Sequence, residues 1–244
     1  MWNSNRSLGE LRALAVHHGI PWRAARLRSF YRSWVPAGGM AFDIGAWDGH
    51  RVRAWRLLGA RVVAVEPREE FARLLHGLYD GDEGVTVVAQ ALDGCGKIVS
   101  ERLLDDGARA PDPARRSGLP FRGARPAPPA TDAATTTLDA LIAREGRPDF
   151  VRLELDGAEP RALDGLGAPL AALCLAGLRP LPARALACLE GLERLGRYRY
   201  RVSAGERMRW LEDEPLDADG LRHWLERLPA DGEAAAGDLY ARLA

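Results

Sequence analysis

Short apolar runs alternate with helix-patterned segments along most of this chain, and that alternation limits the fold more than any other feature. Five runs have the length and composition of buried strands, at residues 40–44, 61–65, 85–89, 150–155 and 173–178. Apolar residues at helical spacing follow at 48–58, 68–78, 158–166 and 183–195. Strands joined through single helices by short connections predict an α/β fold, with a doubly wound, mostly parallel sheet between helices.

The two ends of the chain extend this pattern. Residues 1–37 predict an N-terminal helical extension of two short helices, the second of which begins at Pro21. Its aromatic stripe is expected to pack on the sheet, or else to form a substrate cap or a dimer surface. The stripe consists of Trp22, Phe30, Tyr31 and Trp34. Residues 38–244 predict the main domain, with a closing antiparallel strand pair at 198–202 and 206–210 and a last helix at 216–228.

An insertion rich in Pro, Ala, Arg and Gly interrupts the main domain at 105–134. Such a composition predicts a flexible loop or lid without a core of its own, and residues 97–104 before it are compatible with a hairpin strand. The arginines between 109 and 125 would suit an anionic acceptor, although a flexible insertion is the simpler interpretation. They are Arg109, Arg115, Arg116, Arg122 and Arg125.

Composition excludes several classes of protein. The chain has 244 residues, of which 47% are hydrophobic and 28% charged, which excludes global disorder. Its 34 basic and 34 acidic residues leave no net charge, so nucleic acid and membrane are not expected partners. Three scattered cysteines indicate a reducing cytoplasm. The dominance of arginine over lysine, with abundant Ala, Gly and Pro, is typical of a GC-rich bacterial genome.

The segment MAFDIGAWDGHRVRAWRLLGARVVAVEP carries the first chemical signal. A strand leads into a glycine-containing turn, then a helix, then a second strand that ends at Glu66, which is the geometry of a nucleotide-binding half-fold. A carboxylate at that strand end can accept hydrogen bonds from both ribose hydroxyls. The turn brings backbone amides at a helix N-terminus close to a ligand.

Two kinds of cofactor use this geometry, and the glycine spacing separates them. A dinucleotide site needs G-x-G-x-x-G, but the second and third of those positions here are Trp47 and His50. S-adenosylmethionine has no pyrophosphate and needs only a tight turn and an acid for its ribose. The residues expected to hold it are Asp43, Gly45, Ala46, Gly49 and Glu66, while Trp47 either packs the turn or shapes the methionine pocket.

A second signal lies in the strand at 150–155, which carries alternating charged residues. Period-2 alternation places Arg152, Glu154 and Asp156 on one side of the strand, near its carboxyl end. Ligands bind at that edge of open α/β sheets, and a central parallel strand is normally almost entirely apolar. The three charged residues therefore predict a functional role, with a solvated ion-pair network as the alternative.

Several motifs together resemble the FkbM family of S-adenosylmethionine-dependent methyltransferases. The segments DIGAWDG, VAVEP, AQALDGCGK, TTLDAL and RLELDGAEPRALDGL occur in that family's order, roughly from Phe42 to Leu166. The resemblance implies a class I methyltransferase fold that transfers a methyl group, usually to oxygen. It also implies that Gln90 and Ala91 lie near adenine, and that Glu154, Asp156 and Glu159 line the reaction mouth.

The chain departs from the family pattern at three places. Trp47 replaces the usual Asn, Arg152 replaces the usual Lys, and Glu154 and Asp156 invert the usual order of the two acids. Because arginine does not release its proton in proteins, Arg152 is assigned to acceptor binding together with Glu159, and not to base catalysis. The candidate bases are Glu154, Asp156 and His50. The acidic pair can also hold a divalent metal ion.

The sequence therefore predicts a cytoplasmic methyltransferase that uses S-adenosylmethionine and methylates oxygen of a small-molecule acceptor, such as a sugar or secondary metabolite. A homodimer is compatible with this reading. One alternative is a catalytically degenerate relative that acts as a cofactor-binding or partner module, because the charged strand is altered. A second is an NAD-dependent oxidoreductase, against which Trp47 and His50 argue.

Overall fold

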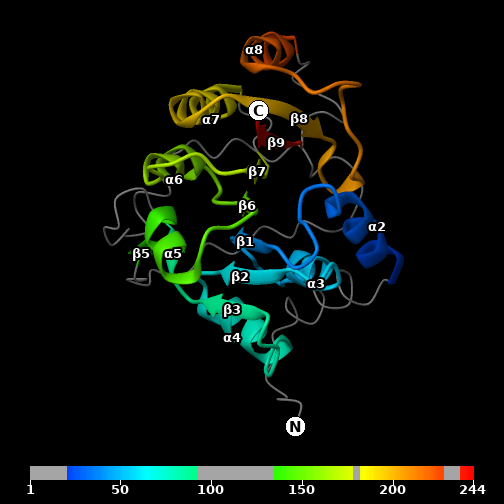
Figure 1. Cartoon of the computed structure of the whole chain (residues 1–244), viewed down its shortest axis with the longest axis vertical. Helices are drawn as coiled ribbons and strands as arrows, with labels where there is room; N and C mark the ends of the chain where they lie inside the picture. The colour runs from blue at the N-terminus through cyan, green and yellow to red at the C-terminus, as the bar shows by residue number, and fades with distance from the viewer. Residues whose placement is uncertain (1–20, 93–134, 178–181, 228–236) are drawn as a thin grey trace.

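A seven-stranded sheet forms the centre of the molecule in the computed structural model (Figure 1). The structure describes residues 21–92, 135–177, 182–227 and 237–244. The sheet order is β3-β2-β1-β6-β7-β9-β8. Its strands are β1 (Met40–Ile44), β2 (Arg61–Val65), β3 (Val85–Val88), β6 (Phe150–Leu153), β7 (Ala172–Leu175), β8 (Tyr198–Ser203) and β9 (Asp238–Leu243). A two-stranded parallel sheet pairs β4 (Ala91–Leu92) with β5 (Thr135–Thr136).

The strand directions confirm the predicted fold class. Strands β3, β2, β1, β6 and β7 are paired in parallel, whereas β9 runs antiparallel to both β7 and β8. This is a doubly wound, mostly parallel sheet with an antiparallel C-terminal strand pair. The chain order reverses between β1 and β6, which is where ligands bind in such sheets.

Helices cover both faces of the sheet, as Figure 1 shows. On one face lie α2 (Pro21–Tyr31) and α3 (His50–Arg56), and on the other lie α5 (Leu138–Glu145), α6 (Glu159–Asp164), α7 (Pro182–Leu195) and α8 (Ala218–Glu226). Helix α4 (Glu69–Leu78) connects β2 to β3. Alternation along the strands separates the two cores: Phe42 and Ile44 face the α5–α8 side, while Ala41 faces the α2–α3 side.

The aromatic stripe of α2 packs on the sheet, as the sequence predicts. Tyr31 is fully buried and meets Trp55 and Phe150 edge to face, with ring centroids 5.3 and 5.8 Å away. Phe30 and Trp34 contact the ring of Tyr240. Trp22 is the exception, because 75% of its surface is exposed. The helix therefore shares a core with the sheet, while the boundaries predicted at 37 and 38 stay a prediction.

One strand of the predicted antiparallel pair is wrong. The segment at 206–210 begins within a 3-10 turn, Gly205–Arg207, and pairs with β8 through an isolated bridge between Ser203 and Trp210 and not as a strand. The partner of β8 is β9, which inserts between β7 and β8. The predicted first helix, the hairpin strand at 97–104 and the insertion at 105–134 lie outside the described residues.

Candidate active site

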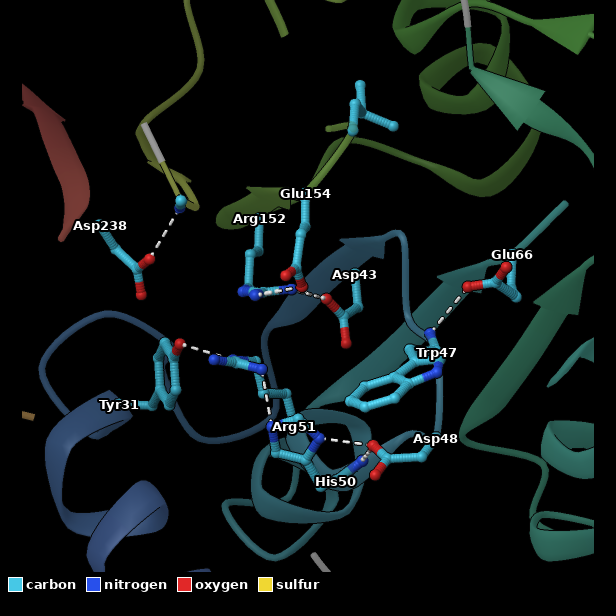
Figure 2. Close-up of polar contacts among 12 residues, drawn as sticks. Tyr31, Asp43, Trp47, Asp48, His50, Arg51, Glu66, Arg152, Glu154 and Asp238 are labelled. Carbon is cyan, nitrogen blue, oxygen red and sulfur yellow. Dashed lines mark hydrogen bonds and ion pairs between the residues drawn. The ribbon is translucent and has the colours of Figure 1, made fainter. Parts of the chain in front are cut away.

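The carboxyl ends of β1, β2 and β6 meet where the strand order reverses, and polar side chains gather there (Figure 2). Asp43 comes from β1, Glu66 follows β2, Arg152 comes from β6, and Glu154 follows directly after it. Asp43, Glu66 and Arg152 are each at most 2% exposed. Charged groups so deeply buried need partners, because desolvation penalises an unpaired charge.

The turn after β1 contacts the ends of both neighbouring strands, β2 and β6. Gly45 has φ +82°, and its N–H donates to the Val65 carbonyl at 2.8 Å. A Cβ on Gly45 would lie 2.3 Å from the carbonyl oxygen of Glu154. Only glycine combines that backbone angle with that approach. The predicted cofactor turn is therefore a tight cradle of bare backbone, which Ala46 continues with a hydrogen bond to the same Val65 carbonyl.

Trp47 occupies a left-handed backbone conformation, with φ +51°. Its N–H donates to Glu66 Oε2 at 2.9 Å, and its half-buried indole lies 5.7 Å from the ring of Phe71. Asn adopts this conformation more readily than a bulky residue does, so Trp47 places strain in the turn. Gly49, with φ +73°, then caps α3.

Glu66 accepts four hydrogen bonds, three of them from Arg68. Oε1 accepts from the backbone N–H of Arg68 at 3.1 Å and from its Nε at 2.7 Å. Oε2 accepts from Arg68 Nη2 at 3.2 Å, in addition to the bond from Trp47 N–H. The predicted ribose acid is thus at the expected strand end, but an arginine that the sequence analysis did not single out holds it.

Arg152 joins the two acids of β1 and β6, as Figure 2 shows. Its Nη1 donates to Asp43 Oδ1 at 3.3 Å and its Nη2 donates to Glu154 Oε2 at 2.6 Å. Burial raises the pKa of Asp43, although Arg152 and Arg51 pull it down. Of the three residues predicted to share one side of the strand, Arg152 and Glu154 meet each other, whereas Asp156 lies in the turn after β6 with φ +51°.

His50, at the start of α3, is engaged at both ring nitrogens. Nδ1 lies 2.5 Å from Asp48 Oδ1, and Nε2 lies 2.6 Å from Arg51 Nη1. Arg51 Nε in turn donates to the Tyr31 hydroxyl at 3.3 Å, which lies 3.1 Å from the hydroxyl of Tyr240. Nε2 can act as a base only if Arg51 withdraws, so this geometry favours a positioning role for His50.

The two remaining acids after β6 differ sharply in exposure. Asp156 is exposed, in a left-handed conformation with φ +51°. Glu159 is fully buried, and its carboxylate accepts from the backbone N–H groups of Leu155 at 2.9 Å and Gly157 at 3.1 Å. Burial raises the pKa of Glu159, against the pull of Arg184. Glu159 therefore shapes the turn after β6, and its predicted contact with an acceptor stays a prediction.

Gln90 lies between β3 and β4, and Ala91 begins β4, where it pairs with Thr135. The amide oxygen of Gln90 is buried and has no hydrogen-bond partner within the described chain. A buried unpaired acceptor of this kind suits a ligand donor such as the amino group of adenine. The role of Gln90 beside adenine stays a prediction.

The sequence analysis missed Arg51, Arg68, Asp238 and the hydroxyls of Tyr31 and Tyr240. Asp238 begins β9, is 6% exposed, and accepts from the N–H of Gly177 at 3.0 Å. Burial raises its pKa, against Arg152 and Arg51. Only Arg68 had a sequence signal, since it stands two positions after the ribose acid. Among the residues described, no group of three or more His, Cys, Asp or Glu side chains is placed to hold a metal ion.

No family model matches the chain, and no curated protein matches its sequence. Similar solved structures include a SAM-dependent O-methyltransferase from Thermotoga maritima, with 14% identity and a TM-score of 0.40 over 92% of this chain and 65% of that one. Another is the O-methyltransferase from Bacillus cereus in complex with SAH, with 13% identity and a TM-score of 0.46 over 100% and 94% of the two chains.

A third is the precorrin-6y C5,15-methyltransferase from Geobacter metallireducens, with 12% identity and a TM-score of 0.44 over 91% of this chain and 87% of that one. The chain spans less than two thirds of the Thermotoga protein. We therefore take the function of this chain from its own site. Among the described helices, none is both long and apolar enough to cross a membrane.

Proposed function

We propose that this protein is an S-adenosylmethionine-dependent methyltransferase. The observation that carries the proposal is the charge of the site at the end of β1. Four carboxylates surround two guanidinium groups there, so acidic groups are in excess. The carboxylates are Asp43, Asp48, Glu154 and Asp238, and the guanidinium groups are Arg51 and Arg152. A sulfonium and an ammonium group suit this charge, whereas the pyrophosphate of a dinucleotide does not.

The residues at this edge fit the parts of that cofactor. The bare backbone at Gly45 and Ala46 lets the methionine portion approach, with Asp43 acting on its amino group through the turn. Glu66 suits the ribose hydroxyls, and the unpaired amide oxygen of Gln90 suits the adenine amino group. When bound, the cofactor supplies a methyl group already activated by its sulfonium charge. This reading agrees with the resemblance to the FkbM family.

The chain's own part in the reaction is to align an acceptor hydroxyl and to take its proton. Glu154 and Asp156 are the accessible candidates, because 29% of the Glu154 side chain is open to solvent and Asp156 is exposed. Arg152 holds Glu154 in place through its hydrogen bond. A small-molecule oxygen acceptor, a sugar or secondary metabolite, completes the proposal.

The variant Glu66→Gln tests the cofactor assignment. It keeps the shape of the side chain but removes the carboxylate charge, so affinity for S-adenosylhomocysteine should fall by about 1–3 kcal/mol. Glu69→Gln is the matched control, because Glu69 lies three positions away and its side chain is 78% exposed. Calorimetric titration of both variants supplies the measurement. Equal affinity in the two variants would overturn the assignment of Glu66.

A non-catalytic, cofactor-binding partner module is the second candidate. It is favoured by the ion pairs of Arg152 with Asp43 and Glu154. These pairs occupy both the acid proposed to act on the cofactor's amino group and a candidate catalytic base. This candidate predicts binding of S-adenosylmethionine without methyl transfer to any acceptor. An oxidoreductase is disfavoured by Trp47 at the second glycine position. The homodimer and the cytoplasmic location stay predictions from the sequence.

A further inference from the structure

The hydrogen-bonding capacity of the Glu66 carboxylate is already used in full. An ionised carboxylate offers about four lone-pair sites, and Glu66 receives four donors. Two are backbone N–H groups, from Trp47 and Arg68, which the turn and the start of α4 hold in place. The other two are Nε and Nη2 of the Arg68 side chain. We call these two side-chain bonds the Arg68 clamp.

The Arg68 side chain is the most readily displaced donor in this arrangement. The backbone N–H groups cannot leave without refolding the turn, but a guanidinium can swing away on its flexible stem. A ribose presents two hydroxyls to such a carboxylate, and the clamp presents two N–H groups. The two ribose hydroxyls can therefore replace the two N–H groups of the Arg68 side chain as donors to Glu66. This replacement leaves the two backbone hydrogen bonds to Glu66 intact.

The position of Arg68 is unusual for a cation. Arg68 is the N-cap residue of α4, where the helix dipole disfavours a positive charge. Its guanidinium carbon lies 4.3 Å from the centre of the Phe71 ring, and only 9% of the residue is exposed. The contacts with Glu66 and Phe71 hold the side chain against the turn that the nucleoside would occupy.

We propose that Arg68 is an internal competitor of the ribose, which must displace the Arg68 clamp before Glu66 can bind the nucleoside. The proposal rests on the proposed function, since it concerns the same cofactor site. It makes Arg68 a specificity-determining residue. A ligand with both ribose hydroxyls replaces both lost bonds, whereas a ligand without them leaves a buried carboxylate short of donors.

The test is the variant Arg68→Met, which removes the guanidinium but keeps an unbranched apolar stem against Phe71. If the clamp closes the site about nine tenths of the time, its removal tightens binding of S-adenosylhomocysteine by about tenfold. Arg73→Met is the matched control, because it removes the same charge from α4 at an exposed side chain that pairs only loosely with Glu69. The control should bind as the unmodified chain does.

The ribose itself provides the second readout. The gain in Arg68→Met should appear with adenosine and vanish with 2′,3′-dideoxyadenosine, which a general loosening of the fold would not do. If Arg68→Met does not fold, Arg68→Lys replaces the two-donor fork with a single ammonium and should give a smaller gain.

The outcomes separate the two proposals. Unchanged or weaker binding by the Arg68 variants, with S-adenosylhomocysteine still bound by the unmodified chain, overturns the clamp and leaves the proposed function standing. Failure of the unmodified chain and of every variant to bind S-adenosylhomocysteine or adenosine overturns both. Binding only after the clamp is removed supports both.

Discussion

The backbone of Gly45 lies against the carbonyl of Glu154, and this contact ties the turn after β1 to the end of β6. A Cβ at Gly45 would lie 2.3 Å from that carbonyl oxygen. Gly59 has nearly the same backbone angle, φ +83° against +82°, but its nearest neighbour, Gly38 N, lies 3.8 Å away from a Cβ built there. The two glycines therefore separate the effect of the backbone angle from the effect of the contact.

We predict that Gly59→Ala lowers the free energy of unfolding by about 1–2 kcal/mol, which is the usual loss for an L residue in the left-handed region. Gly45→Ala should lose about 1–3 kcal/mol more, since the added methyl group must also push β6 away. Urea unfolding of both variants measures the difference. Equal losses would show that β6 does not constrain the turn.

Trp47 should carry measurable backbone strain. With φ +51°, Trp47→Gly is expected to be more stable than Trp47→Ala by about 1 kcal/mol, because both variants lose the indole and only glycine fits the angle without strain. Thermal unfolding of the pair provides the test. An alanine variant as stable as the glycine variant would contradict strain at this residue.

Arg152 should be far more important to stability than a surface arginine. Removing its charge in Arg152→Met leaves Asp43 buried beside no replacement cation at that contact, so we expect a loss of about 3–5 kcal/mol in the free energy of unfolding. Arg144→Met is the control, because Arg144 pairs with Glu145 while its side chain is 47% exposed, and it should lose at most about 1 kcal/mol. Similar losses in both variants would contradict the buried network.

Alkaline pH should weaken the packing of α2 on the sheet. Burial raises the pKa of Tyr31 from 10.0 to about 12, so the folded chain holds a proton that the unfolded chain releases first. Stability from this group is complete below pH 10 and falls as the pH rises towards 12. In Tyr31→Phe this part of the loss should disappear, while the loss of the bond to Arg51 lowers stability at neutral pH. Denaturant titrations at pH 8 and pH 11 measure both effects, and an unchanged pH dependence would contradict the assignment.

The sequence predicts the parallel strands well because local signals delimit them. The bounds of β1 and β2 agree with those expected, since glycines precede or follow both runs and Pro67 comes soon after β2. The partner of β8 could not be predicted in this way. Strand β9 is separated from β8 by a helix and lies between β7 and β8, so its place depends on pairing across the fold and not on a local pattern.

The residues of the site differ in the same way: local sequence patterns predict some of them and not others. The places of Asp43, Gly45 and Glu66 in the site could be predicted, because the sequence shows where a strand ends and where a tight turn begins. The contacts that hold them are not: Tyr31 reaches Arg51 from another helix, and Arg152 meets Asp43 across a sheet register. The chain spacing of these pairs carries no sign that they touch, so their roles needed the fold.

The most direct test of the account is a parallel calorimetric titration of the full chain with S-adenosylhomocysteine and NAD. The excess of carboxylates at this site, with Trp47 in place of the second glycine of a dinucleotide turn, predicts that the sulfur nucleoside binds and that NAD gives no heat. Binding of NAD alone would contradict the account, because the site would then accept a pyrophosphate where the structure places negative charge.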